Sequence, residues 1–461
     1  MDRTVRIVTA TAVALAFAAG AAGGAMAAVP AGGASTDGVW RTDGYGTVLS
    51  LDDGVLREYQ TTSVSCLEGG TARQSGPHTY TADGIVFTLR PGPDGGNATL
   101  SADSSVGHRN LRRVPALPDE CTRPAPKDPR TAFDVFWQSF EENYPFFAAK
   151  GVDWHAVREQ YRPKVHRDTT RQELFALFSD MVRPLHDAHV AVQDGERVFA
   201  QVRPGTEVPT EELDAKVKKY ITARDLKDAP YRRDFANGRI TYADLRHGGQ
   251  GYLRISGFDG YTAEPASYAT QLAVLDRALD TVLTPERTRR LTGLIIDLRV
   301  NGGGSDALAL RIAERLTDTP YIAYAKRARN DPADPARHTR PEPVPVRPAA
   351  APRYTGPVAV LTGGSTVSAG ETFTQALMDR PGRTIRIGQP TQGVFSDVMQ
   401  RGLPNGMAAW LPNEEYLTRT GRTFDGTGIP PHLSEPVFTK EEFAKKRDSA
   451  FDRAVNILRG H

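Results

Sequence analysis

Ser368 lies at a point in the sequence where a strand is expected to turn into a helix. The valine-rich run Pro357–Leu361 ends at a glycine pair, which predicts a short buried strand. Residues 371–378 then carry apolar side chains at helical spacing. A serine at such a junction is exposed at the end of the strand, and the first amide groups of the helix point toward it. It can act as a nucleophile beside an oxyanion site, or it can simply cap the helix.

His189 is the second residue that could take part in chemistry, because it follows a predicted helix and precedes the short alternating run Val190–Gln193. The helix is predicted from the capping box Thr170–Glu173 and the apolar positions that follow it. A histidine at such a boundary can reach a neighbouring active site and accept a proton there. It can equally interact with the helix dipole or lie hydrogen-bonded in the core. His186 is the nearest rival, and on a regular backbone it would point in a different direction.

Three consecutive glycines, Gly302, Gly303 and Gly304, follow the predicted buried strand Leu294–Arg299 and precede a helical pattern. Glycine admits close backbone approach and leaves amide groups free, as an oxyanion-binding turn requires. The run lacks the Lys-Ser/Thr pair of a phosphate loop and the G-x-G-x-x-G spacing of a dinucleotide-binding turn. A tight turn that binds no ligand is the alternative.

The candidate residues require a scaffold in which strands and helices alternate. A strand, a glycine turn and a helix follow one another around Gly302–Gly304 and again around Ser368. Residues 238–438 are therefore predicted to form an α/β core. The capping box Thr439–Glu442 then opens a predicted C-terminal helix over residues 439–461.

Two smaller units precede the core. Residues 37–120 contain short apolar runs between Asp-Gly turns, which predicts a small all-β domain. This unit could be a carbohydrate- or wall-binding module, but a packing appendage is the favoured interpretation. Residues 128–195 show helical patterns instead, beginning with the cap Asp128 and an aromatic stripe, and are predicted to be a helical subdomain.

Composition excludes some functional classes. The 461 residues suggest two to four domains, and 57 basic against 55 acidic side chains leave a formal charge of +2. This near balance argues against a protein that binds nucleic acid or a membrane surface. No internal run is long and apolar enough to span a bilayer.

The N-terminus predicts export. Arg3 and Arg6 precede an alanine-rich apolar stretch, and Ala25-Met26-Ala27 fits a cleavage site, so residues 1–27 are predicted to be a signal peptide. The mature chain is then secreted, extracellular or associated with the cell wall, and has no membrane segment. Its two cysteines, Cys66 and Cys121, are expected to form one disulfide, since an isolated pair in a secreted chain usually does so.

The motifs together resemble the tail-specific, or carboxy-terminal processing, serine peptidases of the S41 type, and more closely their tricorn-core-like branch. The resemblance rests on the order of a D-x-H segment, I-I-D-L-R-V-N-G-G-G, S-T-V-S-A-G-E and F-D-G-T-G-I-P-P, and it covers roughly Thr131 to Phe438. It implies a crotonase-like (ClpP/crotonase) protease core, a peptide or protein substrate, and no metal or organic cofactor. The oligomeric state is left open.

The resemblance also assigns roles to residues. The family's nucleophile falls on Ser368, its histidine on His189, and its oxyanion amides on Ala369 and on Gly303 or Gly304. Asp425 occupies the position where the family has a glutamate, so it is expected to orient His189 as aspartate does in other triads.

Two departures from the family pattern bear on the mechanism. His432 replaces the terminal aspartate of the family's E-G-x-G-I-P-P-D loop. Val394 stands where one branch of the family has the lysine of a Ser-Lys dyad, and valine cannot accept a proton. The base must therefore be another residue, and His189 is the candidate.

The expected activity is that of a serine peptidase. The alternatives are a catalytically inactive crotonase-like protein that binds a peptide or hydrophobic ligand, and an esterase that uses the same serine.

Overall fold

The computed structural model describes residues 36–246, 249–329, 331, 334 and 336–459. The predicted signal peptide, residues 1–27, lies outside the described residues. No helix within these ranges is both long and apolar enough to cross a membrane.

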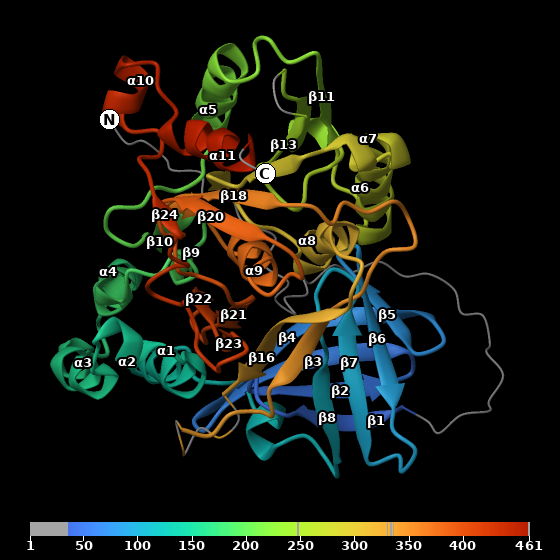
Figure 1. The fold of residues 1–461 in the computed structure, drawn as a ribbon. Helices are drawn as coiled ribbons and strands as arrows, with labels where there is room; N and C mark the ends of the chain where they lie inside the picture. Colours follow the sequence, from blue (N-terminus) through green and yellow to red (C-terminus); the bar gives the residue numbers. More distant parts are fainter. Residues whose placement is uncertain (1–35, 247–248, 330, 332–333, 335, 460–461) are drawn as a thin grey trace.

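An eight-stranded antiparallel barrel forms the N-terminal unit, drawn in blue in Figure 1. Its strands are β1 (Gly38–Thr42), β2 (Thr47–Asp52), β3 (Val55–Thr62), β4 (Ser65–Gly76), β5 (Thr79–Ala82), β6 (Ile85–Pro91), β7 (Asn97–Ala102) and β8 (Arg109–Val114). Apolar side chains such as Trp40 and Leu89 fill the interior. The predicted turn at Asp53-Gly54 has positive φ at both residues, as a tight two-residue hairpin turn requires. The prediction of an all-β domain is thereby confirmed.

The predicted disulfide is present. Cys66 on β4 is bonded to Cys121 in the short helix η1 (Asp119–Thr122). The bond ties the segment that leaves the barrel back onto one of its strands.

A helical unit follows the barrel. Its elements are α1 (Pro129–Asn143), α2 (Phe147–Lys150), α3 (Trp154–Tyr161), η2 (Arg162–Lys164), α4 (Arg171–Val182) and η3 (Arg183–Leu185). Asp128 caps α1 and the Thr170–Glu173 capping box opens α4, as predicted. The aromatic stripe of α1 is core, since Phe133, Phe136 and Phe140 are fully buried.

The hydrophobic core of this unit is completed by strands from distant parts of the chain. A four-stranded sheet of order β10-β9-β22-β21 packs with the helices. Its strands are β9 (Ala191–Asp194), β10 (Arg197–Ala200), β21 (Val398–Gly402) and β22 (Ala408–Pro412). Residues 128–195 therefore do not contain the whole of the unit, because β21 and β22 return to it some 200 residues later.

The α/β core is a seven-stranded sheet of order β11-β12-β13-β14-β18-β20-β24, parallel from β13 to β24. Its strands are β11 (Tyr231–Phe235), β12 (Ile240–Asp244), β13 (Gln250–Ile255), β14 (Gly293–Asp297), β18 (Val358–Thr362), β20 (Thr384–Gly388) and β24 (Leu433–Ser434). Strands such as β14 and β18 are buried along their whole length, which is why their sequences are continuous apolar runs.

Helices cover both faces of this sheet (Figure 1). One face carries α6 (Tyr268–Val282), α8 (Asp306–Ala313) and α9 (Ala369–Ala376). The other carries α5 (Glu211–Arg224) and α11 (Ser449–Arg459). The remaining helices are η4 (Ala236–Gly238), α7 (Pro285–Arg290), η5 (Glu314–Leu316) and α10 (Lys440–Ala444).

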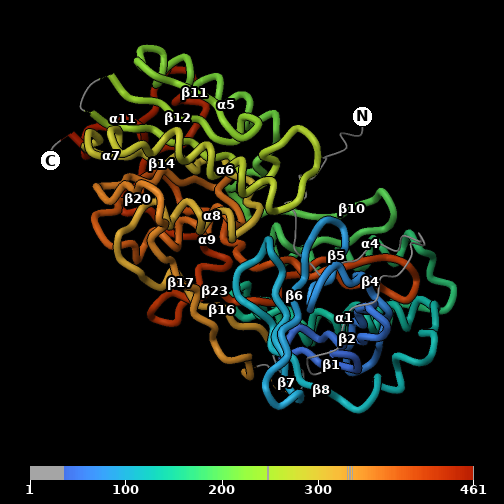
Figure 2. The backbone as a smooth tube through the Cα atoms, turned by 90° about the vertical axis from the view of Figure 1, so that its right-hand side faces the viewer, coloured from blue at the N-terminus to red at the C-terminus, as the bar shows by residue number. Residues whose placement is uncertain are grey.

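Two small sheets join the core to its surroundings. Strands β15 (Val300–Asn301) and β19 (Ser365–Thr366) pair in parallel at the edge of the core. Strands β16 (Tyr321–Ala328), β17 (Glu342–Val346) and β23 (Glu414–Leu417) form an antiparallel sheet in the order β17-β16-β23. Figures 1 and 2 show this sheet between the barrel and the α/β core.

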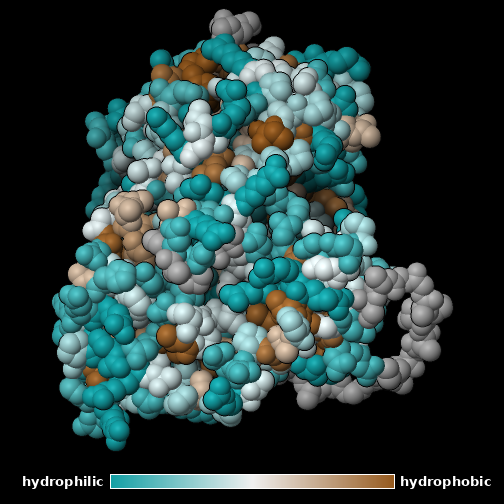
Figure 3. Space-filling view, turned by 90° about the horizontal axis from the view of Figure 1, so that it is seen from below, coloured by the Kyte–Doolittle hydropathy of each residue, from teal (hydrophilic) through white to brown (hydrophobic). Residues whose placement is uncertain are grey.

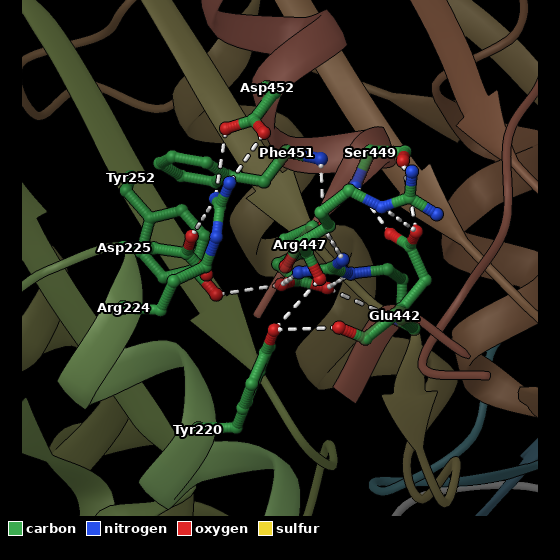
Figure 4. A network of polar contacts seen from close by, with 12 residues as sticks. Tyr220, Arg224, Asp225, Tyr252, Glu442, Arg447, Ser449, Phe451 and Asp452 are labelled. Carbon is green, nitrogen blue, oxygen red and sulfur yellow. Dashed lines mark hydrogen bonds and ion pairs between the residues drawn. The ribbon is translucent and has the colours of Figure 1, made fainter. Parts of the chain in front are cut away.

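The prediction of a single C-terminal helix over 439–461 is wrong, because two helices, α10 and α11, occupy this region. Lys446 has a φ of +50°, which ends the first helix. The Glu442 carboxylate does not return to Thr439 but accepts hydrogen bonds from the amide and hydroxyl of Ser449 (Figure 4). It therefore binds the start of α11 instead of completing a capping box.

Candidate active site

Ser368 lies where the sequence predicted it, at the junction between a strand and a helix. The chain runs from β18 through β19 to Ser368, and α9 begins at Ala369. The backbone of Ser368 has φ 55° and ψ −121°, a strained conformation for a residue that is not glycine. Such strain is found where a sharp turn exposes a nucleophile at the end of a strand.

The glycine turn lies directly against Ser368. Pairing of β15 with β19 sets Asn301 opposite Thr366, two residues before the serine. A Cβ atom on Gly303 would lie 2.6 Å from the Cβ of Ser368, and Gly303 has φ +86°. Only glycine meets both conditions, so the turn is built for close contact with the serine.

The amide groups around Ser368 differ in their availability. Gly303 donates its amide to the Oδ1 atom of Asn301 at 2.9 Å. The Asn301 side chain is held in turn by the carbonyl of Ile255, also at 2.9 Å. Ala369 is the first residue of α9, where amide groups have no acceptor within the helix. Among the candidate oxyanion donors, the Gly303 amide is therefore already engaged by a side chain of the protein.

Three predicted site residues contact three consecutive residues of one segment, Val394–Ser396. The Ser368 amide donates to the carbonyl of Val394 at 3.1 Å. The Phe395 amide donates to the Oδ1 atom of Asp425 at 3.2 Å. The carbonyl of Ser396 lies close enough to the His189 ring to raise its pKa. Residues from three distant parts of the chain thus meet at this segment.

His189 is buried in a pocket that holds its imidazole neutral. Only 8% of the residue is exposed, and burial lowers the pKa of the ring. Its amide donates to the Oδ1 atom of Asp187 at 2.9 Å. Its Nδ1 atom has no hydrogen-bond partner among the described residues. His186, in contrast, is exposed and occupies the left-handed turn that ends η3.

The Asp425 carboxylate is buried, and each of its oxygens accepts a hydrogen bond from a residue nearby. Oδ1 accepts the Phe395 amide, and Oδ2 accepts the Thr423 hydroxyl at 2.5 Å. Burial raises the pKa of Asp425 to about 7. No hydrogen bond joins Asp425 to His189, or Ser368 Oγ to His189, in the described part of the chain.

A buried polar cluster behind His189 escaped sequence reasoning. Tyr144 donates its hydroxyl to the Oδ2 atom of Asp187 at 2.8 Å. The Nζ atom of Lys150 lies 3.8 Å from the same oxygen, and the Lys150 side chain is only 7% exposed. The electrostatic effect of Lys150 reaches both His189 and Asp425. The sequence around Lys150 gives no signal that this lysine is buried, because tertiary packing decides its burial.

Glu371 is a further residue that the sequence did not single out. It lies on α9 and is fully buried. Its carboxylate accepts the amide of Gly393 at 2.6 Å and that of Val394 at 2.8 Å. Burial raises its pKa to about 8. It ties the helix that follows Ser368 to the start of the Val394–Ser396 segment.

The described residues contain no group of three His, Cys, Asp or Glu side chains placed to hold a metal ion.

His432, one of the two departures from the family pattern, binds another part of the core. Its Nδ1 atom accepts the amide of Arg386 at 3.0 Å. His432 therefore fastens the loop after Asp425 to β20.

Residues 249–434 match the sequence model of Peptidase family S41. The chain carries a peptidase family S41 domain. This domain contains the glycine turn, Ser368, the Val394–Ser396 segment and Asp425. Residues 125–183 match the Tricorn protease C1 domain, which corresponds to the helical unit from α1 to α4. The resemblance inferred from the motifs is confirmed.

Solved structures agree with this S41 assignment at the level of the fold. A protein from Parabacteroides merdae ATCC 43184, described as a peptidase, is 24% identical, covers 72% of this chain and 97% of its own, and gives a TM-score of 0.60. Mature CPAF is 12% identical over 72% of this chain and 97% of its own, with a TM-score of 0.50. No curated protein sequence matches the chain.

Proposed function

We propose that this S41 chain is a secreted serine peptidase that hydrolyses peptide bonds through an acyl-enzyme on Ser368. The observation that carries the proposal is the convergence of Ser368, His189 and Asp425 on the Val394–Ser396 segment. A strained serine at a helix N-terminus, a buried neutral histidine and a glycine turn are the parts that acyl transfer requires. We further infer that the α/β core is crotonase-like and that the substrate is a peptide or protein.

In the proposed mechanism, His189 takes the Ser368 proton while Oγ attacks the peptide carbonyl carbon. The carbonyl oxygen becomes an oxyanion that accepts hydrogen bonds from the amides of Ala369 and Gly304. Gly304 is preferred to Gly303 because the Gly303 amide already donates to Asn301. The His189 imidazolium then protonates the leaving amine, and water hydrolyses the acyl-enzyme by the same route in reverse.

Asp425 has an indirect role in this proposal. Its carboxylate holds the Phe395 amide, and the next residue, Ser396, offers its carbonyl to the His189 ring. Asp425 would therefore orient the imidazole by fixing the segment on which the ring rests. Catalytic hydrogen bonds often tighten only in the substrate complex, so the open geometry between Ser368 and His189 is compatible with this mechanism.

Export is part of the proposal. Disulfides persist in oxidising compartments, and the Cys66–Cys121 bond fits a chain cleaved after residue 27. Intact-mass analysis of material from the culture medium should give a chain that begins near Ala28 and has no alkylatable thiol before reduction. Two free thiols would contradict the disulfide and the compartment together.

A fluorophosphonate probe tests the activated serine. The wild-type chain should react with the probe at one site, and Ser368→Ala should not react. Thr366→Ser, which keeps a hydroxyl in the same turn, serves as the control for general damage. A wild-type chain that does not react would point to an inactive ligand-binding protein, and turnover of small esters without peptides would point to an esterase.

A further inference from the structure

The loop between β7 and β8, residues 103–108, is the part of the barrel that enters the S41 domain. Val106 packs against the hydrophobic core on the helical face of the seven-stranded sheet. His108 binds Glu342 of β17 twice, with Nδ1 2.6 Å from Oε1 and its amide 3.1 Å from Oε2. These contacts fix both the middle and the end of the loop on the peptidase.

Two consecutive serines of this loop contact the two turns that form the candidate site. The Ser305 hydroxyl donates to the carbonyl of Ser104 at 2.6 Å. The Ser105 hydroxyl donates to the Oδ2 atom of Asp397 at 3.1 Å. Ser305 directly follows Gly304 of the glycine turn, and Asp397 directly follows the Val394–Ser396 segment. The barrel therefore contacts the end of the glycine turn through Ser104 and the residue after the Val394–Ser396 segment through Ser105.

Asp397 transmits its position to Ser396 through a short network. The Ser396 hydroxyl donates to the carbonyl of Asp397 at 2.7 Å and accepts the amide of Glu414 at 3.0 Å. The Nζ atom of Lys326 lies 3.8 Å from the Asp397 carboxylate. Because the Ser396 carbonyl acts on the His189 ring, a shift of Asp397 changes the surroundings of the base.

We propose that the β7–β8 loop positions the active site, and that Ser105 is a positioning residue for the reaction. The inference rests on the proposed function and extends it to the barrel, which acts as more than an appendage. Catalytic groups must be held within about half an ångström of their productive geometry, and groups on turns need support from neighbouring elements. Ser104 and Ser105 supply that support to both turns at once.

The test compares three full-length variants with the wild-type chain. Ser105→Ala removes the hydrogen bond to Asp397, and Ser105→Thr restores a hydroxyl. Ser75→Ala removes an exposed hydroxyl whose hydrogen bonds are to Thr79 and Thr81 of the barrel. The measurements are kcat and KM for one peptide, the rate of fluorophosphonate labelling between pH 5 and 9, and the thermal melting temperature.

Ser105→Ala should lower kcat and the labelling rate about fivefold, which is the effect of losing a hydrogen bond worth about 1 kcal/mol. KM should stay at the wild-type value, and the melting temperature should fall by no more than about 3 °C. The pH midpoint of labelling should shift, because the environment of His189 changes. Ser105→Thr should recover most of the rate, and Ser75→Ala should match the wild type.

A double-variant cycle with Asp397→Ala, which removes the acceptor of the Ser105 hydroxyl, checks that the serine acts through Asp397. If it does, adding Ser105→Ala to Asp397→Ala should change the rate by less than twofold. Full additivity of the two effects would overturn the coupling.

Several results would overturn the inference. Unchanged labelling in Ser105→Ala would show that the loop does not position the site. If Ser105→Ala and Ser75→Ala lose activity equally and both melt at lower temperatures, Ser105 contributes only to the stability of the barrel. A raised KM with unchanged kcat would mean that the loop contacts substrate instead. A wild-type chain that does not label would overturn the proposed function, and this inference with it.

Discussion

At the scale of single residues, the buried environment of His189 decides whether it can act as a base. Burial lowers the pKa of the imidazole below its usual value of 6.5, so the ring is neutral and able to accept a proton at pH 7. The nearby Asp187 carboxylate opposes this shift, and the ammonium of Lys150 supports it. A base that is neutral over a wide pH range suits the proposed mechanism.

His189→Ala should lower the acylation rate at least about a hundredfold, because general-base catalysis commonly contributes that much. His186→Ala is the matched control and should have little effect, since its side chain is exposed at the end of η3. Fluorophosphonate labelling of the two variants measures the effect. The reverse order of the two effects would show that the D-x-H segment is wrongly assigned.

Asp425→Asn should lower turnover while the protein stays folded, because the asparagine Nδ2 atom donates where the carboxylate accepted the Thr423 hydroxyl, and this loosens the hold on the Phe395 amide. The folded pKa of Asp425, about 7, is raised above the unfolded value of 3.8. Its contribution to wild-type stability is therefore present at low pH and lost as the pH rises toward 7. Asparagine does not ionise, so the melting temperature of the variant relative to wild type should rise between pH 5 and pH 8.

Asp425→Glu, which restores the family's residue, should retain activity or raise it. If Asp425→Asn is kinetically silent, the contacts of Asp425 with Thr423 and Phe395 serve only the turn, and another residue orients His189.

Lys150→Met should shift the pH profile of acylation. The variant leaves the buried carboxylates Asp187 and Asp425 without their nearest ammonium group. The pKa of Asp425 should rise further, so the rate should fall at pH 7 and recover toward alkaline pH. Lys150→Arg should preserve much of the wild-type profile, and Lys164→Met, at an exposed position, should have the wild-type profile. An unchanged profile in Lys150→Met would separate this lysine from the site.

At the scale of elements, local signals predicted the helices and strands that end at the site. Asp128, Thr170 and the valine-rich run before Ser368 mark their elements through caps and periodicity, and the structure has them as predicted. The Val394–Ser396 segment could not be found in this way. It has no regular structure, and its importance comes from partners at Ser368, His189 and Asp425 that lie far away in the sequence.

The C-terminal helix α11 stabilises the strand that leads into the glycine turn. Arg299 follows β14 and is fully buried, with Nη2 2.6 Å from Asp297 and Nη1 2.5 Å from Asp448. Asp448 also accepts the amide of Phe451 at the start of α11. Figure 4 shows a second, exposed pair in the same region, Arg224 with Asp452.

Asp448→Ala should lower the free energy of unfolding by about 3 kcal/mol or more, because it leaves a buried guanidinium short of a partner. Asp452→Ala, which breaks the exposed pair with Arg224, should cost less than about 1 kcal/mol. Denaturant unfolding of the two variants makes the comparison. Equal costs would mean that Arg299 is held by Asp297 alone.

The cost of Asp448→Ala should also depend on pH. Burial and the neighbouring Asp448 raise the folded pKa of Asp225 to about 8, so the wild type loses stability as the pH rises toward 8. Without Asp448 this pKa falls and the loss is smaller. The difference between variant and wild type should therefore be smaller at pH 9 than at pH 6.

At the scale of the whole molecule, the chain order does not match the order of the packed units. The strands β21 and β22 leave the S41 domain to complete the core of the helical unit, and α5 and α11 cover the sheet from outside the predicted range 238–438. Sequence patterns predict which segments are helices or strands, because those depend on neighbours in the chain. They do not predict which distant segments share a core, and for that reason the contact between Ser105 and Asp397 was not foreseen.

Exposed apolar side chains are few and scattered over the described part of the surface. Large apolar side chains that are well exposed in the described residues are Val64, Val198 and Ile322, and each lies on a different element or turn. Figure 3 shows apolar side chains only in small separate groups on the lower face. The barrel does have a contact with the S41 domain, to which its β7–β8 loop contributes.

Buried charges form part of the contact between the barrel and the S41 domain, and a substitution of Tyr45 can test their contribution. The Tyr45 hydroxyl of the barrel donates to the Oε1 atom of Glu414 at 2.6 Å, and Nζ of Lys326 lies 3.2 Å from the same carboxylate. Burial alone would raise the pKa of Glu414, but Lys326 and the Tyr45 hydroxyl overcome this effect and hold the pKa below its usual range. The stability that depends on this carboxylate is present above the ordinary value of 4.5 and is lost as the pH falls.

Tyr45→Phe should therefore lower the free energy of unfolding by about 2 kcal/mol at pH 7, the usual worth of a buried hydrogen bond to a charged group. The cost should shrink as the pH falls below 4.5, because a protonated Glu414 gains less from the hydroxyl. Tyr59→Phe removes a hydroxyl from a half-buried tyrosine on β3 and should change stability by less than about 0.5 kcal/mol. Denaturant unfolding of both variants at pH 4 and pH 7 makes the comparison. A cost for Tyr45→Phe that is independent of pH would mean that the tyrosine contributes by packing and that the barrel is not joined to the peptidase through the ionised carboxylate.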